Sequence, residues 1–184
     1  MTMLSLGLTL FIIIHLIPAA QSLRKGLVAA MGENAYKGVF AMFSLVAMVL
    51  IVLGMGSAEF VEIYTPPVWG RHATGVLMLF ALICLVSFKM KSSIRRITAH
   101  PMSWGIVLWA AGHLFSNGDM ASLALFGSFL VYSIIAMISG NMRGAHASSE
   151  ASSLTQNAVV IAVSLTATVV LVYFHAMFAG VALM

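Results

Sequence analysis

Residues 39–55 read VFAMFSLVAMVLIVLGM, a run in which no side chain is charged. About 20 predominantly apolar residues let an α-helix cross the hydrocarbon core of a bilayer, which is about 30 Å thick. Comparable apolar runs recur along the chain, separated by short polar stretches. This pattern predicts an all-α, polytopic transmembrane helix bundle, because a membrane β-barrel would instead show alternating segments of about 10 residues.

The apolar runs predict about six membrane spans in a single transmembrane domain that covers residues 1–184. The expected limits are 3–20, 39–55, 73–88, 102–115, 120–140 and 158–181. Between the fourth and fifth spans, Asn117 and Gly118 suit a tight turn, and Asp119 suits the N-cap of the next helix. These two spans are therefore predicted to form an antiparallel hairpin.

The composition agrees with a membrane protein, since 61% of the residues are hydrophobic and only 8% are charged. The net charge of +4 does not indicate a nucleic-acid partner, because the basic residues lie between apolar runs, where they determine membrane topology. Eight of the nine basic residues fall on one side of a six-span arrangement: Arg24, Lys25, Lys37, Lys89, Lys91, Arg95, Arg96 and Arg143. Only Arg71 falls on the other side, so the positive-inside rule predicts that both termini face outside.

Two of the connecting stretches are long. Residues 56–69 carry Glu59, Glu62 and Trp69, which is typical of an amphipathic segment held at the outer membrane surface by aromatic side chains. Residues 144–156 are rich in Ala and Ser, which predicts a flexible loop on the cytoplasmic side.

Ionisable side chains inside membrane spans are costly and usually functional, and histidines are the ones found here. With a rise of about 1.5 Å per residue, His15 is expected about 18 Å below the outer surface and His113 about 16 Å from the inner surface. In a core about 30 Å thick, these depths agree to roughly 5 Å. Two imidazoles on separate helices can bind haem iron from its two faces. The alternative is that each histidine is hydrogen-bonded to a neighbouring helix, and spacing alone does not decide between the two.

The other histidines lie nearer the membrane surfaces. His72 and His175 are expected near the outer interface, either as a second ligand pair or as interfacial hydrogen-bonding groups. His100 precedes Pro101 on the cytoplasmic side, where it is expected to cap the next helix or contact lipid headgroups. His146 is expected to be solvated. The sequence contains no CxxCH motif for covalent haem and no HExxH motif for catalytic zinc.

Several motifs resemble those of the NnrU family over roughly residues 5–140. They are HLIP at 15–18 followed by Arg24, GENAY at 32–36, PVWGRH at 67–72, RRITAHP at 95–101 and WAAGHLFSNGD at 109–119. The resemblance makes Arg24 and Asn117 secondary candidates for a site, beside His72, His100 and His175. It also implies a multi-pass protein of the bacterial inner membrane, linked by genetic context to denitrification, the reduction of nitrite and nitric oxide.

The NnrU family is similar to the zeta-carotene isomerase of plants and cyanobacteria, which carries haem b and isomerises a cis double bond. The haem-ligating histidines of that enzyme fall in motifs that match His15 and His113, so the resemblance implies a haem b bound by this pair. Where the isomerase has a Trp-Ile-Gly-Asn-like run after its second ligand, this chain has Phe115-Ser116-Asn117-Gly118-Asp119. A carotenoid pocket is therefore not carried over, since cofactors transfer between relatives more readily than substrates.

Three functions are compatible with the sequence, which leaves open whether the protein is an enzyme. The first is a haem b protein with isomerase-like redox chemistry on a lipid-soluble polyene, or with a role in handling nitrogen oxides. The second is a non-catalytic assembly factor or small subunit, with a membrane protein or a second copy of the chain as partner. The third, a small transporter, is disfavoured because no inverted repeat is visible.

Overall fold

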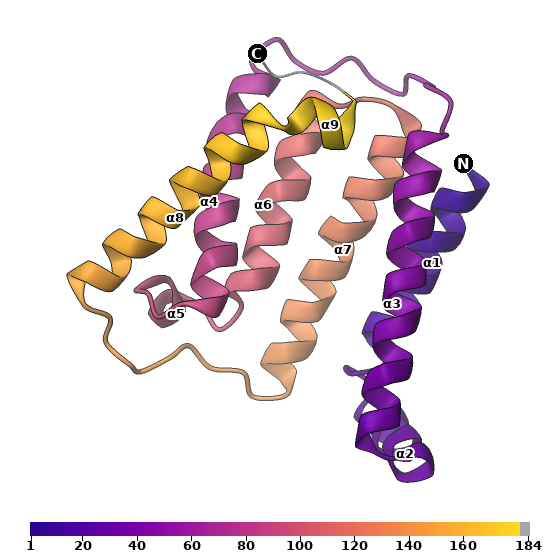
Figure 1. Ribbon diagram of the computed structural model, residues 1–184, viewed down its shortest axis with the longest axis vertical. Helices are drawn as coiled ribbons and strands as arrows, with labels where there is room; N and C mark the ends of the chain where they lie inside the picture. Colours follow the sequence, from indigo (N-terminus) through magenta and orange to yellow (C-terminus); the bar gives the residue numbers. More distant parts are fainter. Residues whose placement is uncertain (181–184) are drawn as a thin grey trace.

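The computed structural model describes residues 1–180, apart from the side chain of Phe178, and places them in helices with short connections (Figure 1). The helices are α1 (Thr2–Leu16), α2 (Gln21–Met31), α3 (Glu33–Gly56), α4 (Gly70–Lys89), α5 (Ile94–Ile97), α6 (Pro101–Ser116), α7 (Met120–Met142), α8 (Leu154–Tyr173) and α9 (His175–Ala179). In the described part of the chain no strand forms, which confirms the all-α prediction. The end of the sixth expected span, at Val181, lies outside the described residues.

The long helices pack in a row in which each one contacts its neighbours. The order is α3, α1, α7, α6, α4 and α8, with the most extensive contacts between α4 and α6 and between α1 and α3 (Figure 1). The start of α1 packs against the end of α3 and the start of α7 through Leu4, Leu8, Ile51 and Ala121. The order of the helices in space therefore differs from their order along the chain, since α7 lies between the pair α1–α3 and the pair α6–α4.

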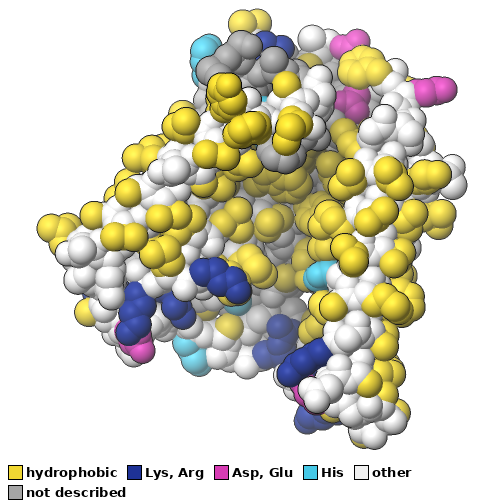
Figure 2. All heavy atoms as spheres, viewed as in Figure 1, with side chains coloured by type: hydrophobic (Ala, Val, Ile, Leu, Met, Phe, Trp, Pro, Cys, Tyr) yellow, Lys and Arg dark blue, Asp and Glu magenta, His cyan; other side chains and the backbone are white. Residues whose placement is uncertain are grey.

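The two ends of the bundle differ in charge. We call the end that holds the α3–α4 connection (57–69) and the α6–α7 turn (117–119) the outer end, and the opposite end, with α2 and α5, the inner end. Figure 2 shows Lys and Arg side chains gathered at the inner end. This placement agrees with the charge distribution expected from the sequence.

The number of spans is lower than expected when each helix is judged alone. Four of the described helices, α3, α4, α7 and α8, are long and apolar enough to cross a membrane. The helices α1 and α6 have only 15 and 16 residues. Counting the bent pair α1–α2 as one span gives up to five by length and composition. The sequence prediction of about six spans is therefore supported only in part.

The first expected span ends early, and the stretch after it is helical. Helix α1 ends at Leu16 instead of continuing to residue 20, and α2 lies at 87° to α1. Pro18 disfavours helical backbone at the residue before it, which is consistent with a break at this point. Residues 21–38 were expected as a connection, but they contain α2 and the first turns of α3. Helix α2 is amphipathic and has no buried residue, as expected for a helix lying at a membrane surface.

The α6–α7 hairpin forms as expected, and the outer connection lies against it. The side chain of Asp119 accepts a hydrogen bond from the Ser122 amide at 2.9 Å, which confirms the N-cap prediction. Residues 57–69 are irregular, and the Ile63 amide donates to the Gly118 carbonyl at 2.8 Å. The turn and the connection therefore form one hydrogen-bonded unit at the outer end.

The Ala- and Ser-rich stretch at the inner end is irregular, and specific contacts hold it against the α5 region. The Ser148 amide donates to the Arg95 carbonyl at 2.7 Å, and Lys91 pairs with Glu150 at 2.8 Å. A capping box between Ser153 and Gln156 then starts α8, four residues before the expected span at 158.

Candidate functional site

His15 lies in the last turn of α1, where α1, α3 and α7 meet. Its Nδ1 donates to the Phe11 carbonyl at 2.8 Å, and its ring stacks on Phe11 with centroids 3.8 Å apart. Phe40 of α3 and Tyr132 of α7 complete the surroundings, with ring centroids 5.1 and 6.0 Å away. Because a carbonyl oxygen only accepts, Nδ1 carries the proton, and in the neutral ring Nε2 is the nitrogen with a lone pair for a ligand.

His113 repeats this arrangement in the last turn of α6. Its Nδ1 donates to the Trp109 carbonyl at 2.8 Å, four residues earlier. Its ring stacks on Phe126 of α7 with centroids 4.5 Å apart, and Trp109 lies 5.5 Å away. Both histidines are half-buried, and each follows an aromatic residue by four positions. A metal-binding histidine commonly has one ring nitrogen fixed in this way by a carbonyl, which orients the other toward the metal.

A stripe of aromatic residues on α7 connects the two histidines. Phe126, Phe129 and Tyr132 follow one another at intervals of three, so they lie on one face of the helix. Phe129 is 5.0 Å from the Phe11 ring and 5.6 Å from the Trp109 ring. The rings therefore form a continuous path from His15 on α1 to His113 on α6. This stripe is the part of the site that the sequence analysis missed, because its role depends on which helices flank α7.

The histidines are offset along the membrane normal by more than the sequence suggests. His15 contacts Tyr132 and His113 contacts Phe126, six residues earlier on α7, which corresponds to about 9 Å along the helix axis. Side chains on a helix tilt toward its N-terminus. Helices α1 and α6 run in opposite directions, so the two imidazoles tilt toward each other (Figure 1).

The donor chemistry of this pair fits haem iron. Each histidine has the tautomer that exposes Nε2, and its neighbours are aromatic, as in an apolar haem pocket. Among the described residues, no group of three or more His, Cys, Asp or Glu side chains offers an alternative metal site.

His175 and His72 occupy the outer end, where the sequence analysis expected them. His175 is the first residue of α9 and interacts electrostatically with His113, a neighbour that the sequence did not suggest. His72 is exposed in the first turn of α4. The structure therefore brings His175 to the candidate ligand His113.

His100 joins two helices at the inner end instead of capping one. It occupies the N-cap position of α6, but its side chain makes no capping hydrogen bond. Its Nε2 is 2.7 Å from Oδ1 of Asn141 on α7. A methyl group on Gly140 would lie 2.5 Å from the His100 ring, so glycine is what allows the ring to lie against α7.

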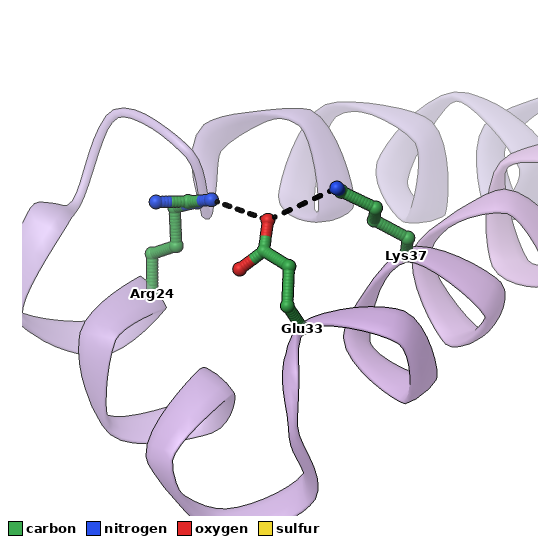
Figure 3. Close-up of polar contacts among 3 residues, drawn as sticks. All are labelled: Arg24, Glu33 and Lys37. Atoms are coloured by element: carbon green, nitrogen blue, oxygen red, sulfur yellow. Dashed lines mark hydrogen bonds and ion pairs between the residues drawn. The ribbon is translucent and has the colours of Figure 1, made fainter.

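Arg24 holds the angle between α2 and α3. Its guanidinium is 3.0 Å from a carboxylate oxygen of Glu33, which Lys37 also approaches at 3.4 Å (Figure 3). It also lies over the ring of Tyr36, 5.7 Å from the centroid. These contacts explain why Arg24 and the GENAY motif occur together, and they indicate a structural role at the inner end.

Asn117 supports the helix that carries His113. Its Nδ2 donates to the His113 carbonyl at 2.9 Å, and its own carbonyl accepts from the Tyr64 hydroxyl at 2.9 Å. The Tyr64 hydroxyl also contacts the Leu114 carbonyl. Asn117 therefore fixes the end of α6 one turn beyond the candidate ligand.

A family model described as NnrU protein matches residues 3–183, almost the whole chain. The chain belongs to the NnrU family. This match extends the resemblance seen in residues 5–140 through α8, which the motifs alone did not reach. Searches of curated proteins and of solved structures found no match.

Two of the motifs that resemble the NnrU family meet in the fold. The motifs at 67–72 and 109–119 meet at the outer end, where a side chain on Gly70 would collide with the Phe115 carbonyl. The Thr74 hydroxyl donates to the Gly112 carbonyl at 2.7 Å, next to His113. These two stretches of the chain therefore supply the contacts that support His113 as well as the histidine itself.

Proposed function

We propose that this protein binds haem b within the membrane, with His15 and His113 as the residues that would hold it. The observation that carries the proposal is the matched pair of Nδ1–carbonyl hydrogen bonds, which directs Nε2 of each ring to a ligand. The aromatic stripe on α7 and the tilt of the two imidazoles toward each other also support it. The offset of the rings along the helix axis predicts that α1 or α6 shifts along its axis when haem binds.

Bound haem would supply one-electron redox chemistry or a site for a small ligand such as nitric oxide. The chain itself holds each imidazole in one tautomer and surrounds it with aromatic side chains that exclude water. The family context supports a role in nitrite and nitric oxide reduction, and the likeness to the carotenoid isomerase supports redox isomerisation of a lipid-soluble polyene.

We also propose that all six long helical segments cross the bacterial inner membrane, with both termini outside. The short helices α1 and α6 each pack between two longer helices, α1 between α3 and α7 and α6 between α4 and α7, as expected for spans inside a bundle. The eight basic residues at the inner end support the orientation. A periplasmic phosphatase reporter fused after Met184 is expected to be active, and an inactive reporter would reverse the orientation.

The test of haem binding is a visible spectrum of the purified protein, made with ample haem and recorded before and after reduction by dithionite. We expect a Soret band that sharpens on reduction, together with α and β bands, as for low-spin haem with two histidine ligands. His15→Ala and His113→Ala should each abolish the low-spin spectrum. His146→Ala, at an exposed histidine, is the matched control and should leave it unchanged.

Other spectra would contradict the proposal in different ways. A band that survives both substitutions would exclude this ligand pair. A featureless spectrum, with a partner that copurifies in a fixed ratio, would instead favour the assembly-factor or small-subunit function.

A further inference from the structure

A groove at the inner end is lined by described residues that do not include either candidate haem ligand. It has a volume of about 470 Å³ and lies between α6, α7 and the stretches that flank them. Its polar members include His100, Asn141 and His146, and its apolar members include Trp104, Ile134 and Ile138. The volume falls within the range of about 300–1,000 Å³ that is usual for small-molecule sites.

The groove is polar at the membrane surface and apolar toward the bilayer. His100 and Asn141 are joined at 2.7 Å at the inner end of α6 and α7. Ile138 and Ile134 lie about one and two turns deeper on α7 and are exposed, as is Trp104 on α6. In a membrane such side chains face lipid tails. A molecule with a polar head and an apolar tail can therefore enter sideways from the bilayer.

The lining indicates a neutral head group. None of the described residues that line the groove is Lys, Arg, Asp or Glu, so a phosphate head group would have no charged partner there. If Asn141 accepts from His100, its NH₂ group has N–H bonds to offer to a carbonyl oxygen. The Trp104 indole adds a flat surface on which a ring can stack.

We propose that this groove binds the head of a lipid-soluble quinone or quinol. The carbonyl or hydroxyl groups of the head contact His100 and Asn141, the ring packs against Trp104, and the tail runs along Ile134 and Ile138 into the bilayer. Gly140 belongs to the site because it lets the His100 ring lie beside α7. The groove thereby provides a place where a membrane-soluble electron carrier docks.

The probe is a short-chain azido-ubiquinone, photolysed with the full-length protein in phospholipid nanodiscs, and the labelled residues are mapped by mass spectrometry. We expect saturable labelling within 97–104 and 134–147, lost in the presence of excess ubiquinone-2. This readout does not involve haem absorbance, so it can fail or succeed separately from the proposed function.

Two matched pairs of variants test the location. Ile134→Trp fills the groove and should weaken quinone binding about tenfold, whereas Ile135→Trp, one residue further on the exposed side of α7, should not. Gly140→Ala should weaken it by displacing His100, whereas Gly127→Ala on the same helix meets open space and should not. Labelling that spreads along all lipid-facing helices, or equal binding by Ile134→Trp and Ile135→Trp, would overturn the proposal.

Discussion

The outer and inner ends of this bundle are held together by different kinds of contact. At the outer end, backbones touch: Gly118 lies against the Tyr64 carbonyl and Gly70 against the Phe115 carbonyl. At the inner end, exposed side chains make most of the connections, such as Arg24 with Glu33 and Lys91 with Glu150. Such close backbone contacts leave no room for an added side chain. Each exposed ion pair, in contrast, contributes little to the free energy of unfolding.

The contrast matters for the candidate site because the two candidate ligands, His15 and His113, lie nearer to different ends. Around His113, Asn117 and Thr74 hold the backbone of α6 through hydrogen bonds. Around His15, the hydroxyl of Tyr132 reaches the His15 carbonyl only at 3.4 Å, and α1 ends one residue later. If haem binds as proposed, we therefore expect His113 to keep its place and His15 to be the residue that moves.

The largest effect on the free energy of unfolding is expected from a substitution at the backbone contact of the outer end. Gly118→Ala places a methyl group against the Tyr64 carbonyl, and we expect a loss of about 3 kcal/mol in the free energy of unfolding. Gly26→Ala at the inner end meets open space and should be neutral or slightly stabilising, because Ala favours helix. Unfolding of both variants in mixed detergent micelles measures the difference, and equal stability would remove the distinction between the ends.

The sequence predicts the fold to the extent that each helix carries its own signal. The apolar runs of α3, α4, α7 and α8 and the N-cap at Asp119 are local features. Helix α2 is not predicted from the sequence because its residues are too polar to register as a membrane span. The break after Leu16 shortens the first span, although Pro18 marks its position in the sequence.

The sequence singles out two histidines as candidate ligands, but it does not show what surrounds them. His15 and His113 stand out as ionisable residues in apolar runs. The aromatic stripe from Phe126 to Tyr132 does not, because aromatic residues are common in spans and only packing shows that α1 and α6 flank α7. The approach of His175 to His113 likewise depends on how α9 folds back over the outer end.

A smaller effect is expected from the hydrogen bonds that end α6. Asn117→Ala removes the side-chain donor to the His113 carbonyl, which should cost about 1 kcal/mol of unfolding free energy. Asn34→Ala, at an exposed asparagine of the inner end, is the control and should change it little. Thermal unfolding of the two variants makes the comparison, and a larger effect of Asn34→Ala would contradict the assignment of rigidity to the outer end.

The ion pair at the inner end should matter less. Arg24 and Glu33 are each 42% exposed, so Arg24→Ala is expected to cost only about 0.5 kcal/mol, with Lys37 still beside Glu33. The cost should shrink further in 1 M salt, where the screening length is about 3 Å. Lys25→Ala on the same helix is the control. A salt-independent loss from Arg24→Ala would show instead that its packing over Tyr36 is what matters.

The smallest effect concerns the loop before α8 and depends on pH. The hydrogen bond from Lys91 holds the pKa of Glu150 below its ordinary value. The Lys91–Glu150 pair stabilises the loop fully above the ordinary pKa of a glutamate. This stabilisation is lost as the pH falls through the lowered pKa of Glu150. Hydrogen exchange at the Ser148 amide, corrected for its intrinsic rate, should therefore become faster only in that acidic range. Lys91→Ala should already exchange faster at neutral pH and lose the pH dependence. Because Glu150 is fully exposed, the free energy of unfolding of the bundle should not change over this pH range. A drop in that free energy would mean that the surface contacts of the inner end stabilise the whole bundle and not only the loop.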